Sequence, residues 1–240
     1  MYHRVTLSCS PSAGSACIVL LVHMPLGELS YCNGPSLVVK RIMHIVRRQG
    51  DDPSSMYVLQ APWGDILQIW RWRSYEESPT PVELPRHLEG HNKDDINPYI
   101  ELRTTEIEVY KVDLENQTLV KMANLADHAL FLGYNSTMCF ASKDFPTLKP
   151  NCVYITDDSV EYVNMCKHNW REIRVWDIEN NSLQTFDSDL LTASSWMNWP
   201  SPVWIYNTLP FLVSDFLFSD RHCKLFLSLF IAIFFHCITD

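Results

Sequence analysis

Glycine is scarce in this chain: its 240 residues include only 7 Gly, against 14 Pro. The glycine-rich loops that cradle phosphates are missing, since neither Gly-x-x-x-x-Gly-Lys nor Gly-x-Gly-x-x-Gly occurs. The Gly-x-Ser-x-Gly elbow of hydrolases and the His-Glu-x-x-His pair of metalloproteases are absent as well. Because the commonest catalytic signatures are missing, we expect a chain that is not an enzyme and that uses no cofactor.

Paired metal ligands are also lacking. The chain has 8 Cys, but no two stand at the two-residue gap of a zinc knuckle or a redox pair. We therefore expect free thiols, no metal site, and a reducing intracellular setting, either cytoplasmic or nuclear. Two acidic pairs, Asp94/Asp95 and Asp157/Asp158, could suggest calcium or a carboxylate dyad, but the second follows a strand directly, where acids commonly begin a turn.

Positive charge is in short supply outside the first fifty residues. The net charge is -9, and residues 1–50 hold five Lys or Arg against one acid, which leaves fourteen basic and twenty-seven acidic residues beyond. This balance makes nucleic acid an unsuitable partner for the main body.

A long hydrophobic run is missing too. The longest uncharged apolar stretch, 225–238, has fourteen residues, whereas a bilayer-spanning helix needs about twenty. We expect an apolar helical tail over 206–240 that does not span a membrane. A tail-anchored membrane protein is the alternative.

A repeated motif is the strongest positive signal. VYKVDLENQTLV at 109–120 reappears as IRVWDIENNSLQ at 173–184, and each copy reads as two short strands joined by a polar turn. We expect positive φ at the Asn of each turn. The turn residues in the two copies are Asp113, Glu115, Asn116, Asp177, Glu179 and Asn180.

Strand-like runs recur between residues 17 and 205, and no segment there keeps a helical period over three turns. Each repeated hairpin closes a set of four strands, and four antiparallel strands form one propeller blade. We therefore predict an all-β fold, an incomplete β-propeller of about three blades. The expected strands are 17–22, 28–32, 37–42, 56–61, 66–72, 106–113, 118–122, 129–133, 151–156, 172–178, 183–187 and 202–205.

Two further features bear on binding. The segment 74–105 is acidic and rich in proline, and we expect a loop insertion in the propeller domain. Large aromatic rings in or beside strands usually fill the space between blades, but an exposed patch for a partner is the alternative. Trp63, Trp199 and Trp204 are the candidates for such a patch.

The ordered motifs at 128–139, 145–158, 171–186 and 199–205 resemble a plant family, the F-box-associated KIB-type β-propellers, also described as kelch-like and long labelled a domain of unknown function. They read HALFLGYNSTMC, FPTLKPNCVYITDD, REIRVWDIENNSLQTF and WPSPVWI. The resemblance covers roughly 17–205, after an N-terminal extension at 1–16. It implies a propeller that captures a target protein, often behind an F-box that docks onto a cullin ubiquitin ligase.

The chain departs from the family pattern in three places. No helical F-box precedes residue 17, so we expect no direct docking to the ligase adaptor. The sequence at Cys32 and Asn33 changes abruptly from a strand-like run to a turn-like one. The tail beyond Ile205 matches nothing in the family. We therefore expect a non-enzymatic protein-interaction module with an unknown target. A regulatory or non-functional fragment from a splice variant or a faulty gene model is the second alternative.

Overall fold

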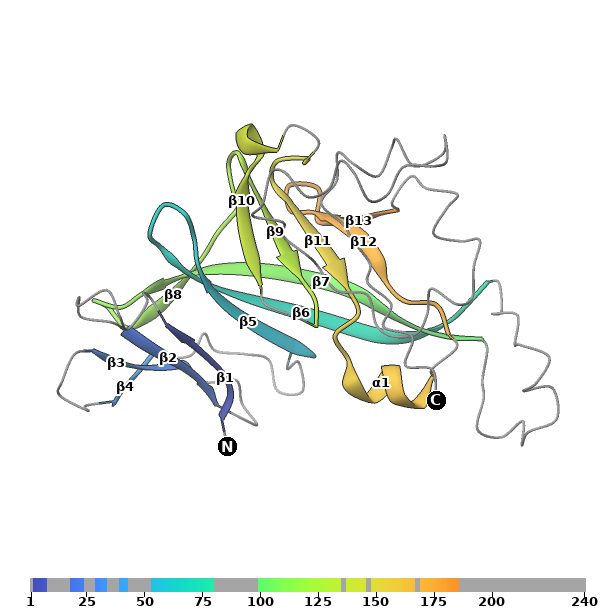
Figure 1. The fold of residues 1–240 in the computed structure, drawn as a ribbon, viewed down its shortest axis with the longest axis horizontal. Helices are drawn as coiled ribbons and strands as arrows, with labels where there is room; N and C mark the ends of the chain where they lie inside the picture. Colours follow the sequence, from blue (N-terminus) through green and yellow to red (C-terminus); the bar gives the residue numbers. More distant parts are fainter. Residues whose placement is uncertain are drawn as a thin grey trace, which may run out of the picture.

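Three β-sheets form the described part of the computed structural model (Figure 1). The structure describes residues 2–7, 18–23, 29–33, 39–42, 53–79, 99–134, 137–145, 148–166 and 169–185. The predicted all-β class is confirmed, since strands dominate these residues and the one α-helix has six residues.

The first sheet is an antiparallel meander in the order β1-β2-β3-β4. Its strands are β1 (Tyr2–Leu7), β2 (Ile18–His23), β3 (Leu29–Asn33) and β4 (Val39–Arg41). Strand β1 was not predicted: it falls in the expected N-terminal extension 1–16, yet it pairs along its length with β2. A basic residue, Arg4, interrupts its apolar pattern, so the sequence did not predict a strand here.

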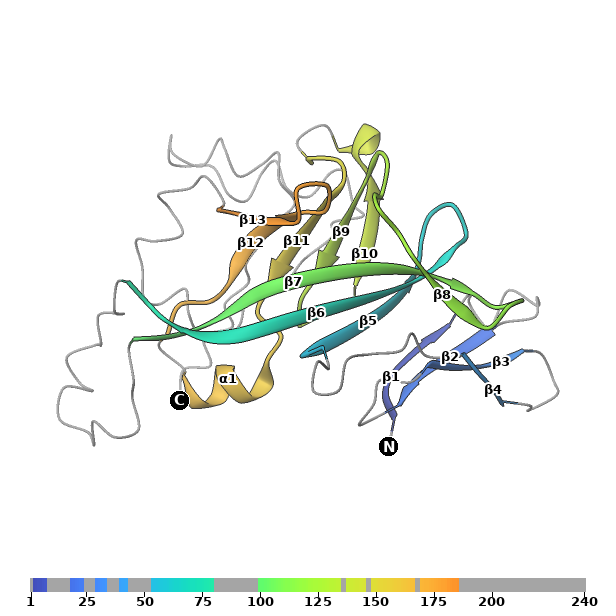
Figure 2. The same cartoon turned by 180° about the vertical axis from the view of Figure 1, so that it is seen from behind.

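The second sheet has the order β5-β6-β7-β8, again a meander. Its strands are β5 (Ser55–Gln60), β6 (Ile66–Glu77), β7 (Ile100–Asp113) and β8 (Thr118–Lys121). The pairing of β6 with β7 runs from Leu67/Lys111 to Glu77/Ile100, with a register shift between Trp72 and Arg73. Seen from behind, this two-stranded ribbon continues from beside the first sheet to beyond the helix (Figure 2).

The long ribbon corrects the predicted loop at 74–105. Residues 74–77 and 100–105 are paired strand, although charged residues and threonines there lack a clear apolar alternation. Ladder hydrogen bonds between two neighbouring strands extend the ribbon without needing that alternation. The centre of the segment, 80–98, lies outside the described residues.

The third sheet has five strands in the order β10-β9-β11-β12-β13. They are β9 (His128–Leu132), β10 (Met138–Ala141), β11 (Cys152–Thr156), β12 (Ile173–Asp177) and β13 (Ser182–Thr185). The expectation of four antiparallel strands was wrong here. Strand β10 adds an edge, and β9 runs parallel to β11. The chain reaches that parallel partner through β10 and a short 3-10 helix at Ser142–Asp144.

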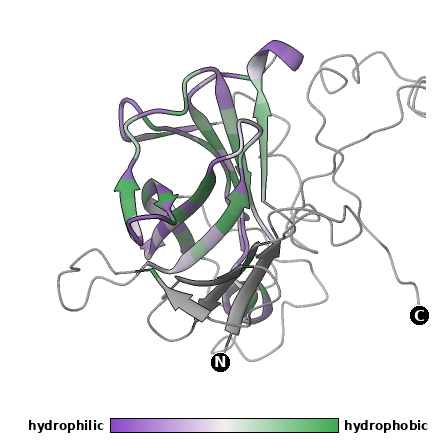
Figure 3. Cartoon of the chain, turned by 90° about the vertical axis from the view of Figure 1, so that its left-hand side faces the viewer, coloured by the Kyte–Doolittle hydropathy of each residue, from purple (hydrophilic) through white to green (hydrophobic). Residues whose placement is uncertain are grey.

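The sheets stack face to face through apolar side chains. Tyr57, Leu67 and Ile69 of the second sheet belong to one buried cluster with Leu130 and Ile155 of the third. Figure 3 shows hydrophobic segments concentrated in the strands and hydrophilic ones at the connecting turns. The second sheet is therefore the middle layer, with the third sheet on one face.

The opposite face of the second sheet meets the first. Tyr31 and Ile42 pack with Val58, Ile66 and Val112, and the Tyr31 hydroxyl donates a hydrogen bond to the backbone oxygen of Leu114 at 3.0 Å. This stacking of sheets is the arrangement expected of consecutive propeller blades.

Helix α1 (Val160–Met165) was not predicted either. Ser159 caps its N-terminus, because the Ser159 side chain accepts a hydrogen bond from the Tyr162 backbone N–H. Six residues are too few for a helical period to show in the sequence.

Several sequence expectations fall on undescribed residues. The strand at 202–205 and the tail at 206–240, with its apolar run 225–238, lie outside the described residues. Among the residues that the structure does describe, no helix is long and apolar enough to cross a bilayer.

Candidate functional site

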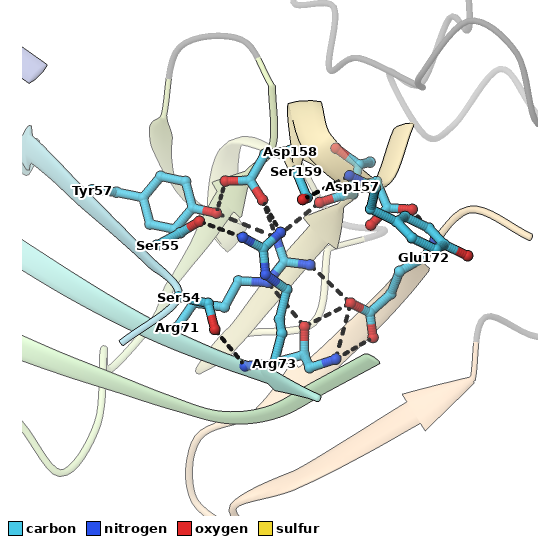
Figure 4. Close-up of polar contacts among 12 residues, drawn as sticks. Ser54, Ser55, Tyr57, Arg71, Arg73, Asp157, Asp158, Ser159 and Glu172 are labelled. Carbon is cyan, nitrogen blue, oxygen red and sulfur yellow. Dashed lines mark hydrogen bonds and ion pairs between the residues drawn. The ribbon is translucent and has the colours of Figure 1, made fainter. Parts of the chain in front are cut away.

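A dense polar cluster lies between the second and third sheets, and Figure 4 shows it in close-up. We call it the Arg71 network. Its members are Tyr57, Arg71, Arg73, Thr104, Asp157, Asp158 and Glu172. The first four come from β5, β6 and β7, and the carboxylates come from the segments that follow β11 and precede β12.

Strand alternation places Arg71 in this interface. Side chains two apart on a strand share a face, so Arg71 points to the same side as Ile69, which belongs to the buried cluster between the sheets. Trp70 points the other way and packs on Tyr110 with ring centroids 4.5 Å apart. A guanidinium thus enters the interface beside the apolar cluster.

The Arg71 guanidinium is fully buried and is held by donated hydrogen bonds. Its Nη2 lies 2.8 Å from the Glu172 carboxylate and its Nη1 lies 3.3 Å from that of Asp158. The remaining acceptors are the Tyr57 hydroxyl at 3.2 Å, the Thr156 backbone oxygen at 2.9 Å and Thr104 Oγ1 at 2.9 Å. A charge withdrawn from water needs such a full set of partners.

The carboxylates of Glu172 and Asp158 also accept hydrogen bonds from other residues of the network. Glu172 accepts hydrogen bonds from the Thr104 backbone N–H at 2.9 Å and from the Thr104 hydroxyl at 2.6 Å. Asp158 accepts from Arg73 Nη1 at 2.5 Å and from the Tyr57 hydroxyl. The side chains of Asp158 and Glu172 are each only 2% exposed, so the ion pairs are shielded from solvent.

Burial and neighbouring charges both shift the pKa values of this cluster. Burial opposes the charge on Arg71, but Tyr57, Glu172 and Asp158 together outweigh it and raise the pKa of Arg71. Burial also raises the pKa of the Tyr57 hydroxyl to about 12. Tyr57 therefore stays a neutral donor, which suits its hydrogen bond to Asp158.

Asp157 differs from its neighbour. Its Oδ2 accepts the Glu172 backbone N–H at 2.9 Å, and its side chain is fully buried. Burial, followed by the nearby Glu172 charge, raises the pKa of Asp157 to about 7, although Arg71 and Arg171 act in the opposite direction. The carboxyl is therefore poised to change charge near neutral pH.

Taken together, these contacts suit an architectural role. A catalytic acid, base or nucleophile must reach a substrate, whereas Arg71, Asp158 and Glu172 are buried and bonded to one another. From the sequence we interpreted Asp157 and Asp158 as acids that begin a turn, but in the structure Asp158 bonds to Arg71 and Asp157 to the Glu172 backbone N–H. The one sequence signal for the Arg71 contact was an arginine inside an aromatic strand, between Trp70 and Trp72.

The comparison with protein families adds the decisive observation. A family model described as the KIB1-4 beta-propeller matches residues 38–187. The chain belongs to this family. The match takes in the second and third sheets and the Arg71 network, while the bounds 17 and 205 that we predicted remain a prediction. No curated protein and no solved structure matches the chain.

The repeated turns of this KIB1-4 family member join β7 to β8 and β12 to β13, as predicted. Asp113 accepts the backbone N–H and the side-chain amide of Asn116 at 3.0 and 2.8 Å. Asp177 receives the same two bonds from Asn180, at 3.0 and 2.8 Å. These bonds lower the pKa of both aspartates, because they favour the charged carboxylate.

The expected positive φ at Asn116 and Asn180 was wrong. The left-handed residues are the next ones along, Gln117 with φ 55° and Asn181 with φ 46°. Each predicted Asn instead uses its side-chain amide to close the turn onto the aspartate. The third residue of each turn, Glu115 or Glu179, is exposed.

The tryptophans of the described residues separate into two groups. Trp70 and Trp176 are buried, which confirms packing as their role. Trp63 is 40% exposed in the β5–β6 turn, where its ring lies edge-on to His128 with centroids 4.5 Å apart. Trp199 and Trp204 lie outside the described residues.

Proposed function

We propose that this KIB1-4 β-propeller family member is a non-enzymatic protein-interaction module that captures a target protein. The observation that carries the proposal is the use of the buried charges: Arg71, Asp158 and Glu172 join two sheets rather than line a reaction centre. Membership of a propeller family supports the same role, because stacked blades present surfaces.

The proposal is tested by affinity capture with the full chain, followed by titration of each purified prey in a calorimeter. The matched control is Ile155→Asp, which places a charge in the buried cluster between the sheets and leaves every surface residue in place. A true target binds the wild-type chain saturably and binds Ile155→Asp much more weakly, because its surface needs the folded scaffold.

Two results would contradict the proposal. One is that no prey binds the wild-type chain saturably. The other is that every prey binds Ile155→Asp equally well, since such binding would come from exposed apolar segments rather than from a folded surface.

A further inference from the structure

Exposed apolar side chains gather where helix α1 meets the far end of the β6–β7 ribbon. Tyr75 on β6, Tyr99 just before β7 and Met165 on α1 are each more than half exposed. They are three of the seven large apolar side chains that are exposed among the described residues. We call these three the Tyr75 surface. Apolar residues scattered singly are ordinary, but a group at one place suggests contact with another molecule.

Specific contacts hold the ribbon and the helix together. The Tyr162 hydroxyl of α1 donates to the backbone oxygen of Ile100 at 3.2 Å, and the Asn169 side-chain amide donates to the same oxygen at 2.6 Å. Tyr75 lies over the helix, with its ring centroid 6.2 Å from that of Tyr162. Met165 follows Glu161 by one helical turn, so both lie on the side of α1 next to Tyr75.

The two strand ends of the ribbon are also tied to each other here. The Ser78 backbone N–H donates to the backbone oxygen of Tyr99 at 2.5 Å, and the Ser78 hydroxyl donates to Glu101 at 2.5 Å. Tyr162, Ser78 and Asn169 are all buried. The Tyr75 surface therefore stands on a fixed base, which limits the entropy lost when a partner binds.

The charge around this surface is negative. Glu77 on β6 and Glu161 on α1 are exposed beside it, and Glu161 is among the groups that raise the pKa of Tyr75, after burial. Glu76, one residue earlier on the strand than Glu77, points to the opposite face of the ribbon. The nearby cations are already engaged: Arg73 pairs with Asp158 at 2.5 Å, and Arg103 pairs with Glu101 at 2.8 Å and Glu76 at 3.4 Å.

We propose that the Tyr75 surface is a docking site for a basic protein segment that carries an apolar side chain at its centre. The apolar residue packs against Tyr75 and Met165, and the flanking Lys or Arg residues face Glu77 and Glu161. Rigid aromatic anchors within a charged rim are typical of binding hot spots, and complementary charge selects the partner. This inference rests on the proposed function as an interaction module.

Two labelled twelve-residue peptides test the docking site by fluorescence anisotropy with the full chain. One has Lys and Arg around a central Leu-Trp pair, and the other has Glu and Asp around the same pair. We expect the basic peptide to bind and the acidic one not to bind. Raising the salt concentration should weaken the binding, because screening removes the charge attraction. Lack of binding by the basic peptide at about 1 mM would overturn the proposal.

Variants then locate the binding. Tyr75→Ser, and Glu77→Lys combined with Glu161→Lys, should each weaken binding of the basic peptide about tenfold or more. The matched control is Val120→Ser, because Val120 is exposed on β8, which pairs with the end of β7 opposite Tyr75. Equal losses in Tyr75→Ser and Val120→Ser, or none in the charge reversal, would contradict the site. Unchanged melting midpoints show that the variants remain folded.

The same variants separate this inference from the proposed function. A captured target that binds wild-type chain, Tyr75→Ser and the charge reversal with one affinity would leave the interaction module standing and remove the Tyr75 surface as its site. If no target binds the wild-type chain, the proposed function itself fails.

Discussion

The guanidinium of Arg71 lies 2.8 Å from the carboxylate of Glu172, although 101 positions separate the two residues in the sequence. Arg71 belongs to the second sheet, and Glu172 stands just before the fourth strand of the third sheet along the chain. This pair, with Asp158 and Tyr57, adds hydrogen bonds of defined geometry between the two sheets. Apolar packing alone is not directional and would not fix their relative position.

Replacing Arg71 should be among the most damaging single changes in the chain. Arg71→Met leaves the Glu172 and Asp158 carboxylates buried without their shared partner, so we expect a loss of about 3–5 kcal/mol in the free energy of unfolding. Urea denaturation of the full chain measures it. The control is Arg103→Met at a partly exposed pair, which should cost under about 1 kcal/mol. Similar costs for the two variants would refute the buried role of Arg71.

The raised pKa of Asp157 makes stability depend on pH. The folded state holds the proton up to about pH 7, whereas the ordinary pKa is 3.8, so the folded chain binds more protons in between. Stability from this group is therefore full below the ordinary pKa and is lost as the pH rises to about 7. Asp157→Asn keeps an acceptor for the Glu172 N–H but does not titrate.

The free energy of unfolding of the Asp157→Asn variant, relative to that of wild type, should thus rise between pH 4 and pH 7. The reason is that only the wild-type chain loses the stability that the proton on Asp157 contributes. Urea midpoints at a series of pH values give the comparison. A constant difference between the two proteins across this range would show that Asp157 titrates normally.

The turn geometry predicts opposite outcomes for two adjacent residues. Gln117 has φ 55°, so Gln117→Gly should leave stability unchanged or raise it, while Gln117→Val should lower it by about 1–3 kcal/mol. Asn116→Gly should be destabilising, because it removes the amide bond to Asp113 and relieves no strain. Thermal unfolding of the three variants decides the matter, and a tolerated Asn116→Gly beside a harmful Gln117→Gly would reverse the assignment.

The interface between the second and third sheets should behave as a true core. Leu130 is fully buried in the shared cluster, so Leu130→Ala should cost about 2–5 kcal/mol through lost contacts and a cavity. Val120→Ala, at an exposed position on β8, should change stability by less than about 0.5 kcal/mol. Equal effects in chemical denaturation would mean that the sheets do not pack through this cluster.

Much of the fold could be predicted from the sequence because the strands are regular. Runs such as MYVLQ and CVYIT combine aromatic and β-branched residues, and the repeated turns mark two hairpins directly. The parallel pairing of β9 with β11 could not be predicted in this way, since hydrophobic alternation defines a face but not a neighbour. The short strand β10, MCFA, gives too little pattern to recognise.

The candidate site was less predictable than the strands. Asp157 and Asp158 were noticed as a pair, but Arg71, the partner of Asp158, stands 87 positions away and meets it only after the sheets stack. The positive φ was placed one residue early, because Asn tolerates that conformation and the sequence does not show that its amide already bonds to Asp113. The docking surface joins residues from a ribbon and a six-residue helix, which no local pattern connects.

Hydrogen exchange of the full chain with and without Arg71→Met tests most directly whether the Arg71 network joins the second and third sheets into one scaffold. The account predicts faster amide exchange in both sheets, in β5 and β6 and equally in β11 and β12, because a shared network protects them together. Faster exchange confined to β6 around residue 71, with β11 and β12 unchanged, would contradict it.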